Sequence, residues 1–402
     1  MKTFASLSLT LSLLVVACAG SDSTEEAAVV DSPAVPIRVA LFNIKELSTQ
    51  ALADASGEQL RAAAEIIGRI QPDILVLQEI DHDLSRPDDL AANARRFAEA
   101  FLGEQVSLPY AYAAPCNTGR LSGIDLDGDG QVATAEDVGT RQHGGDSYGF
   151  GTYPGQYSMA VLSRYPIAGD DARTFQNFPW RYLPGNHLPK DFYSAPAVER
   201  LRLSSKSHWD LPIEVGEKRL HLWISHPTPP AFDGDEDRNG RRNFDEIKLW
   251  VDYLEGVEAL VDDQGRSGGF ASAAPFVIVG DLNARPNEET SLYDGRTAIS
   301  QLLDHRDIID PVEHLVSSGA RAHLAAYLRE GGPKARPPSG PPGMATATFL
   351  GGSRVDYLLP RQNLGVIDGG VFWPSEEEDA TGYRLAEEAS DHRLVWLDLV
   401  MP

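Results

Sequence analysis

The chain has 402 residues, of which 42% are hydrophobic and 23% charged, a composition typical of folded globular proteins rather than disordered ones. Acidic residues outnumber basic ones by 59 to 35, and the net charge of −24 argues against broad electrostatic binding of a polyanion. Any phosphate that the protein recognises should therefore be bound by a local group of side chains.

The N-terminal segment has the features of a bacterial signal peptide. A basic start precedes an apolar stretch that is too short to span a bilayer as a stop-transfer helix. The letters VVAC end at Cys18 and resemble a lipobox, which predicts a lipoprotein-type signal over residues 1–18, lipidation of Cys18 and an extracytoplasmic protein anchored to the membrane. Ordinary secretion is the alternative. Residues 19–36 are rich in Ser, Glu, Ala and Pro and are predicted to form a flexible tether.

Strands and helices alternate in the chain that follows. Apolar residues recur at a period of two over residues 37–43, which predicts a strand, and at spacings of three and four over residues 60–70, which predicts a helix. An apolar strand over residues 74–77 leads to Glu79. Further strands are predicted over residues 158–163, 201–205, 220–225, 275–280, 354–359 and 394–400, and further helices over residues 88–101 and 245–261.

This order of elements predicts one α/β domain over residues 37–402, a four-layer sandwich of two packed mixed β-sheets flanked by helices. A hairpin that turns at residues 215–218 adds antiparallel pairing. Stretches at about 113–155 and about 305–347 are rich in Gly, Pro and polar residues and are predicted to be surface insertions rather than separate domains. Cys116 is the one cysteine in the predicted domain, which excludes an intrachain disulfide there.

Polar residues that suit phosphate chemistry stand at the ends of the predicted strands. Each has a structural explanation when it is taken singly, since a carboxylate at a strand end is usually a turn residue or a helix cap. As an ordered set, an Asn, a strand-end Glu, a His, an Asp-x-Asn, a strand Asp and an Asp-His pair are more informative. These residues are Asn43, Glu79, His226, Asp281, Asn283, Asp356, Asp391 and His392.

The ordered set resembles the endonuclease/exonuclease/phosphatase superfamily, whose members include pancreatic deoxyribonuclease, sphingomyelinases and inositol-polyphosphate phosphatases. The resemblance implies hydrolysis of phosphate esters with a divalent metal, Mg²⁺ or Mn²⁺, held by Asn43, Glu79 and Asp391, and such cations prefer hard oxygen ligands. The catalytic residues that it implies are His226, Asp281, Asn283, Asp356 and His392.

Within that catalytic set, the resemblance implies that Asp281 orients or deprotonates the attacking water. Asn283 would hold the phosphoryl group by hydrogen bonds, and His226 would contact phosphate oxygens or donate a proton to the leaving group. Asp356 is expected to fix the orientation of His392, which has the same two alternative roles as His226.

Two acidic loops match the calcium-binding pattern of EF-hands. In the first, glycine occupies the sixth position, and the ligand positions are held by Asp125, Asp127, Asp129, Gln131 and Glu136. Glycines upstream exclude a preceding helix, so that structural Ca²⁺ would hold the first insertion through a loop alone; a solvated acidic turn is the alternative. The second stretch is rich in Arg, and a calcium loop, phosphate contacts in the substrate pocket and a salt-bridged helix start are three readings of it. Its candidate residues are Asp235, Asp237, Asn239, Arg241, Arg242, Asn243 and Glu246.

The segment over residues 204–209, SSKSHW, concentrates hydrogen-bond donors near the end of a predicted strand. A contact with a phosphate or a sugar is one explanation for these donors. The structure of the hairpin that follows is the other explanation, and it is the one that the sequence favours.

Three functions fit these observations. The first is a secreted phosphoesterase that hydrolyses phosphodiesters or phosphomonoesters of small organic or lipid-headgroup substrates by in-line attack of water. The second is an extracellular nuclease acting on DNA or RNA, which the lack of long basic and aromatic patches disfavours. The third is a non-catalytic calcium-binding surface lipoprotein, and the complete catalytic set argues against it. No protein partner is predicted.

Overall fold

The computed structural model describes residues 36–287, 293–331 and 343–402, so the predicted signal peptide and Cys18 lie outside the described residues. The strands are β1 (Ile37–Leu47), β2 (Ile74–Ile80), β3 (Tyr110–Tyr112), β4 (Ser158–Ser163), β5 (Arg173–Thr174), β6 (His208–Val215), β7 (Lys218–Ser225), β8 (Phe276–Asp281), β9 (Asp356–Pro360), β10 (Gly365–Val371) and β11 (Val395–Val400). The α-helices are α1 (Glu58–Ile70), α2 (Ala92–Phe97), α3 (Arg141–Gly145), α4 (Ala195–Arg200), α5 (Arg238–Leu254), α6 (Ser300–Leu303), α7 (Ser318–Arg329) and α8 (Ala380–Ala389). Within these ranges, every helix is too short or too polar to cross a membrane.

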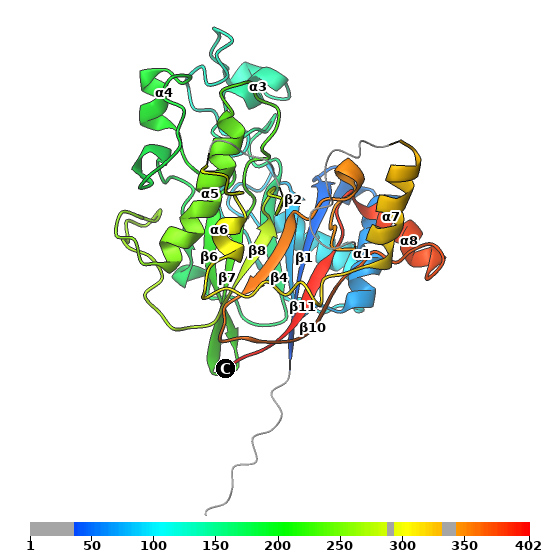
Figure 1. The fold of residues 1–402 in the computed structure, drawn as a ribbon. Helices are drawn as coiled ribbons and strands as arrows, with labels where there is room; N and C mark the ends of the chain where they lie inside the picture. The colour runs from blue at the N-terminus through cyan, green and yellow to red at the C-terminus, as the bar shows by residue number, and fades with distance from the viewer. Residues whose placement is uncertain (1–35, 288–292, 332–342) are drawn as a thin grey trace, which may run out of the picture. The chain divides into compact units, whose positions relative to one another are not determined.

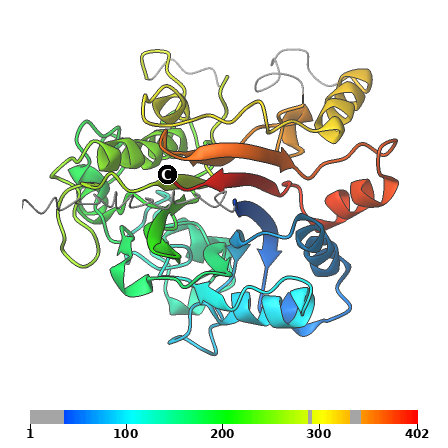
Figure 2. The same ribbon diagram turned by 90° about the horizontal axis from the view of Figure 1, so that it is seen from below.

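The strands form two mixed sheets, which confirms the predicted fold class. The six-stranded sheet has the order β10-β11-β1-β2-β4-β3, and the five-stranded sheet has the order β5-β6-β7-β8-β9. Each sheet contains one parallel pair, β1 with β2 and β7 with β8, and the other neighbours are antiparallel. Strand β11 lies between β1 and β10, so the last strand of the chain is paired with the first (Figure 2).

Alternation of side chains along the strands explains the layers. Val39 and Leu41 of β1 belong to the core between the two sheets, whereas Ala40 and Phe42 point to the opposite face and pack with residues of α1 and α2. The five-stranded sheet has the same arrangement, with α5 on its outer face. Figure 1 shows α5 and α1 on opposite sides of the packed sheets. Three apolar layers, one between the sheets and one under each helical layer, therefore hold the sandwich together.

One predicted strand and one predicted helix differ from the structure. Residues 201–205 form no strand, and the first strand of the predicted hairpin is β6, which begins at His208 and pairs with β7 through the turn after Val215. Helix α5 begins at Arg238 rather than at residue 245, although Asn-Gly near its start favours a turn. Buried contacts of its first turns, described below, stabilise the helix there. Helix α7 lies within the second predicted insertion.

Candidate active site

Six of the predicted site residues meet at one edge of the packed sheets. The parallel strands β1, β2, β7 and β8 end near this edge, and the antiparallel strands β9 and β11 begin there. Because the end of one strand lies beside the start of its antiparallel neighbour, residues far apart in the sequence become neighbours. The six residues are Asn43, Glu79, His226, Asp281, Asp356 and His392.

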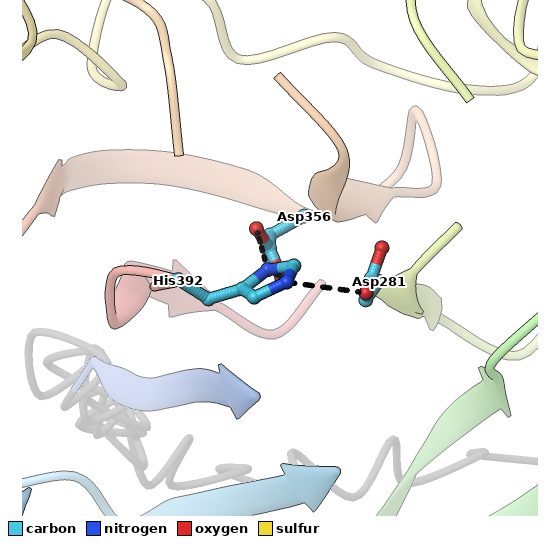
Figure 3. Close-up of side chains that lie close together, drawn as sticks. All are labelled: Asp281, Asp356 and His392. Atoms are coloured by element: carbon cyan, nitrogen blue, oxygen red, sulfur yellow. Dashed lines mark hydrogen bonds and ion pairs between the residues drawn. The ribbon is translucent and has the colours of Figure 1, made fainter. Parts of the chain in front are cut away.

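The imidazole of His392 lies between two carboxylates (Figure 3). Its Nδ1 is 2.9 Å from Oδ2 of Asp356, and its Nε2 is 3.7 Å from Oδ2 of Asp281. The hydroxyl of Thr346 donates to Oδ2 of Asp356 at 2.7 Å, which fixes the carboxylate that orients the ring. Burial alone would lower the pKa of His392, but the charges of Asp356 and Asp281 raise it to about 10. The ring is therefore protonated at neutral pH and carries a charged donor at Nε2.

One carboxylate oxygen of Asp281 is approached by three nitrogen atoms. Nδ2 of Asn43 donates to Oδ2 at 3.1 Å, and Nε2 of His226 and Nε2 of His392 lie 3.6 and 3.7 Å from the same atom. Burial raises the pKa of Asp281 to about 7, although the positive charge of His392 opposes this shift. A carboxylate with a pKa near neutrality is well matched to accept a proton from water.

Glu79 and Asn43 lie side by side on the six-stranded sheet, and Oδ1 of Asn43 accepts the backbone N–H of Lys45 at 3.2 Å. Nδ2 of Asn43 donates to Oε1 of Glu79 at 3.1 Å. Glu79 has φ = 61°, which non-glycine residues rarely adopt, and the pairing of β2 with β4 shifts register between Gln78 and Ile80. Irregularities of this kind often aim a side chain at a functional site. Carboxylate oxygens are ligands that Mg²⁺ and Mn²⁺ prefer, so the carboxylate of Glu79 fits such an ion.

Asp391, the third predicted metal ligand, lies beside an acidic cavity. The hydroxyl of Ser390 donates to the backbone carbonyl of Asn43 at 2.8 Å, which holds this segment next to β1. Oδ2 of Asp391 is 3.6 Å from Nζ of Lys45. The cavity has a volume of about 390 Å³, and its lining carries four carboxylates against one ammonium group. Its lining residues are Lys45, Glu46, Gln59, Thr348, Glu387, Glu388, Ser390 and Asp391.

The two predicted phosphate-contacting residues of the five-stranded sheet lie on adjacent loops. Nδ2 of Asn283, which has φ = 49°, donates to the backbone carbonyl of Pro227 at 3.1 Å. Burial and the positive charges of Lys206 and His392 lower the pKa of His226 well below its usual value, so its ring is neutral. Nδ1 of His226 is buried and has no hydrogen-bond partner among the described residues. The two histidines of the site therefore differ in charge.

Gln78, which the sequence analysis did not select, joins the two sheets beneath the site. Its Nε2 donates to the backbone carbonyl of Ser225 at 2.8 Å, and its Oε1 accepts the backbone N–H of Asp281 at 2.7 Å. It therefore helps to fix the position of Asp281. The available signal was an amide in the apolar run ILVLQEI, because a buried amide needs hydrogen-bond partners.

Two buried polar residues of α5 hold the loops that follow β7 and β8. Nδ2 of Asn243 donates to the backbone carbonyls of Thr228 and Leu282, both at 2.9 Å. The carboxylate of Glu246 accepts the backbone N–H groups of Ser205 and Thr228, both at 2.6 Å. The same loops carry the first histidine and the asparagine of the predicted catalytic set, so α5 positions these residues from behind.

Contacts of the Arg-rich stretch bear on its three readings. Among the residues that the structure describes, Asp235, Asp237 and Glu246 form no cluster that could hold a metal ion. The buried guanidinium of Arg242 donates to three backbone carbonyls, and that of Arg241 donates to one. Asn239 also donates to a carbonyl within this loop. The contacts of Arg242, Arg241 and Asn239 fit the structural reading, and the calcium and phosphate-contact readings remain predictions.

The carboxylate cluster of the first acidic loop includes a residue outside the EF-hand pattern. Carboxylate oxygens of Asp125, Asp127 and Asp146 lie within 4.8 Å of one another. Asp146 is buried, and its two oxygens accept backbone N–H groups of the loop at 2.7 Å each. A Cβ atom at Gly145 would lie 2.2 Å from Oδ2 of Asp127, so the close approach of Asp127 favours glycine there.

The last predicted ligand of this loop lies elsewhere. The pattern assigned the closing position to Glu136, which is exposed and is not part of the carboxylate cluster. Asp129 and Gln131 are also exposed, and Oδ1 of Asp129 accepts the backbone N–H of Gln131 at 2.7 Å. The ring of three carboxylates thus combines two residues of the pattern with Asp146, because the chain returns to the loop where α3 ends.

Comparisons with known proteins identify the family of the chain. The sequence model of the Endonuclease/Exonuclease/phosphatase family matches residues 40–392. An endonuclease/exonuclease/phosphatase from Beutenbergia cavernae has 16% sequence identity and a TM-score of 0.51, with 91% of this chain and 72% of that chain covered. The human Nocturnin catalytic domain with bound sulfate has 16% identity, a TM-score of 0.45 and coverage of 92% and 94%. The mannosyl-6-phosphatase Bt3783 of Bacteroides thetaiotaomicron has 13% identity, a TM-score of 0.44 and coverage of 91% and 100%. A search of curated protein sequences found no significant match.

Proposed function

The chain belongs to the endonuclease/exonuclease/phosphatase family, a family of phosphate-ester hydrolases, and on that premise we propose which esters it cleaves and how. The protein is a metal-dependent phosphoesterase outside the cytoplasm, and it hydrolyses small organic or lipid-headgroup phosphate esters by in-line attack of water. The observation that carries this proposal is the position of Asp281 beside a protonated His392 and a neutral His226.

The three side chains divide the chemistry between them. Asp281 accepts the proton of the attacking water, because its pKa of about 7 leaves about half of it ionised at neutral pH and most of it ionised above. The charged Nε2–H of His392 stabilises negative charge that develops on the phosphoryl oxygens, and Asp356 keeps this donor oriented. The neutral His226 provides a second contact to the phosphoryl group or to the leaving oxygen.

A divalent cation completes the site. Glu79 and Asn43, with Asp391, would hold Mg²⁺ or Mn²⁺ through oxygen atoms. When bound, the ion neutralises charge on the phosphate and makes the phosphorus more electrophilic. The amide of Asn43 also donates to Asp281, so the candidate metal ligands and the candidate base share one hydrogen-bonded group.

The charge around the site favours a small ester over a polynucleotide. The adjoining cavity carries four carboxylates and one ammonium group, and the whole chain has a net charge of −24. Further phosphates of a nucleic acid would be repelled by such a surface, since nucleic-acid binding depends on neutralising them with Lys and Arg. A substrate with one phosphate avoids this repulsion.

Two finer features belong to the same proposal. We propose that the cluster of Asp125, Asp127 and Asp146 binds Ca²⁺ as a structural ion, which the number of carboxylate oxygens within 4.8 Å supports. We also propose that lipidation of Cys18 anchors the protein to the membrane, on the basis of its lipobox-like sequence.

Substrate profiling of the purified full chain tests this proposal. The chain is assayed with Mg²⁺, Mn²⁺ or Ca²⁺ against p-nitrophenyl phosphate, bis-p-nitrophenyl phosphate, sphingomyelin and plasmid DNA. We expect metal-dependent hydrolysis of the small esters or of the lipid at rates well above those with DNA. Hydrolysis of DNA in preference to all other substrates would establish the nuclease alternative, and no hydrolysis of any substrate with any metal would contradict the proposal.

A further inference from the structure

Lys206 is a buried lysine next to the active site that the family resemblance does not assign. It lies two residues before β6, whose first residue, His208, pairs with Ser225 at the end of β7. The hydroxyl of the preceding Ser205 donates to the backbone carbonyl of His226 at 3.3 Å, so this segment contacts the loop that follows β7 directly. Lys206 is only 7% exposed.

The ammonium group of Lys206 has no partner among the residues that the structure describes. Across the described residues, no hydrogen-bond acceptor or ion-pairing carboxylate lies within bonding distance of its Nζ. Lys248 of α5 offers a contrast, because its Nζ is 2.5 Å from Oδ1 of Asp252. A cation that is largely buried and unpaired is costly, so it needs a partner from water or from a ligand.

The charges around Lys206 belong to the active site. Burial lowers the pKa of Lys206, whereas the carboxylates of Glu246, Glu79 and Asp281 act in the opposite direction. The first of these three already accepts two backbone N–H groups, while Glu79 and Asp281 are the candidate metal ligand and base. The positive charge of Lys206 also lowers the pKa of His226. The charge of Lys206 therefore acts on Glu79, Asp281 and His226, and the neighbouring Ser205 contacts the backbone of that histidine.

We propose, on the basis of the proposed function, that Lys206 binds the non-bridging oxygens of the substrate's phosphoryl group and stabilises their charge during hydrolysis. The phosphoryl group supplies the anion that the buried ammonium lacks, and the ammonium supplies a positive charge from the five-stranded sheet, opposite the oxygen ligands of the six-stranded sheet. The donors of residues 204–209 thus have two roles. Ser205 and His208 bond within the fold, as the sequence favoured, and Lys206 is left for the ligand.

The test compares Lys206→Met with Lys248→Met in the full chain. The first substitution keeps most of the side-chain volume and removes the charge, so we expect kcat/KM for the small ester to fall about 100-fold, as when one charge-stabilising donor is lost. Its melting temperature should stay equal or rise, because an unpaired buried charge has been removed. Lys248→Met should keep its activity and melt at a lower temperature, because Asp252 loses its partner.

Inorganic phosphate provides a second readout that needs no turnover. With Mg²⁺ present, phosphate should raise the melting temperature of the parent chain by preferential binding to the folded state. This rise should disappear in Lys206→Met and in Lys206→Gln, and it should persist in Lys206→Arg. The Gln and Arg variants keep the test valid if the Met variant does not fold.

The outcomes separate this inference from the proposed function. A parent chain that hydrolyses no ester contradicts the proposed function, yet its phosphate-dependent melting still tests Lys206. If Lys206→Met hydrolyses the ester within about threefold of the parent rate and keeps the phosphate effect, the inference is overturned and the proposed function stands. A fall in melting temperature in every Lys206 variant, with the phosphate effect retained, would assign Lys206 a structural role.

Discussion

Asp281 and Asp356 are paired residues of the antiparallel strands β8 and β9, yet the imidazole of His392 stands between their carboxylates. His392 comes from the other sheet, where it precedes β11. Both carboxylates therefore belong to one sheet and the histidine that they share belongs to the other. This group of three exists only when the two sheets are packed, so the candidate site depends directly on the core between them.

Replacement of the candidate base should abolish most turnover. Asp281→Asn keeps the size of the side chain and removes its ability to accept a proton, so we expect kcat for an activated phosphodiester to fall by at least about 100-fold. Asp210→Asn is the matched control, because Asp210 is a buried aspartate paired with His221, 2.6 Å from its Nδ1, in the same sheet. The control should lose stability and keep activity. Near-normal turnover by Asp281→Asn would remove Asp281 from the mechanism.

The pH dependence of activity should show two ionisations, that of Asp281 and that of His392. Activity should rise with pH as Asp281 ionises near pH 7 and should fall again as His392 loses its proton near pH 10. The carboxylate of Asp356 raises the pKa of His392, so Asp356→Asn should move the alkaline fall to lower pH. Initial rates between pH 5 and pH 11 measure both limbs. An alkaline limb that does not move would contradict the orienting role of Asp356.

The metal requirement should depend on Glu79. Replacing its carboxylate by an amide in Glu79→Gln removes a charge from the candidate ligand set, so the Mg²⁺ concentration for half-maximal activity should rise at least about tenfold. At saturating metal, much of the rate should return. Titration of activity with Mg²⁺ and Mn²⁺ gives these values. Loss of rate without any change in metal dependence would mean that Glu79 is not a ligand.

The calcium loop offers a test between sequence pattern and structure. Ca²⁺ should raise the melting temperature of the parent chain, and this rise should vanish in Asp127→Asn, whose carboxylate belongs to the cluster. Glu136→Gln should keep the rise, because Glu136 is exposed outside the cluster. Thermal melts with Ca²⁺ and with EGTA measure the effect. The opposite result, dependence on Glu136 alone, would restore the EF-hand assignment.

Lipidation should decide where the protein is found. A chain with a net charge of −24 has no electrostatic attraction to an anionic membrane, so its association with the membrane should depend on Cys18. The parent protein should enter the detergent phase of cell extracts, and Cys18→Ser should move to the aqueous phase or remain as precursor. Quantitative recovery of the parent from the medium, with an N-terminus after Cys18, would indicate ordinary secretion.

Most strands left local signals in the sequence, whereas the catalytic set rests on the resemblance of an ordered series of strand-end residues to a family and stays a prediction. A period of two identifies a strand such as residues 37–43, and polar residues at strand ends, such as Asp281, stand out against apolar runs. The hairpin turn after Val215 and the two mixed sheets were predicted on the same grounds and are confirmed. These features depend on neighbours within a few residues, which is the range over which pattern and propensity act.

The partners of buried polar groups were decided only by the tertiary structure. Gln78 bridges the two sheets. Asn243 and Glu246 hold two loops from α5, a helix that begins earlier than the sequence pattern predicts. In the acidic loop, the carboxylate cluster contains Asp146 and not Glu136. Each of these contacts depends on which strand or loop packs beside the residue. A buried polar group must be paired, but the sequence around it does not say with which distant group, since that follows from sheet order and layer packing.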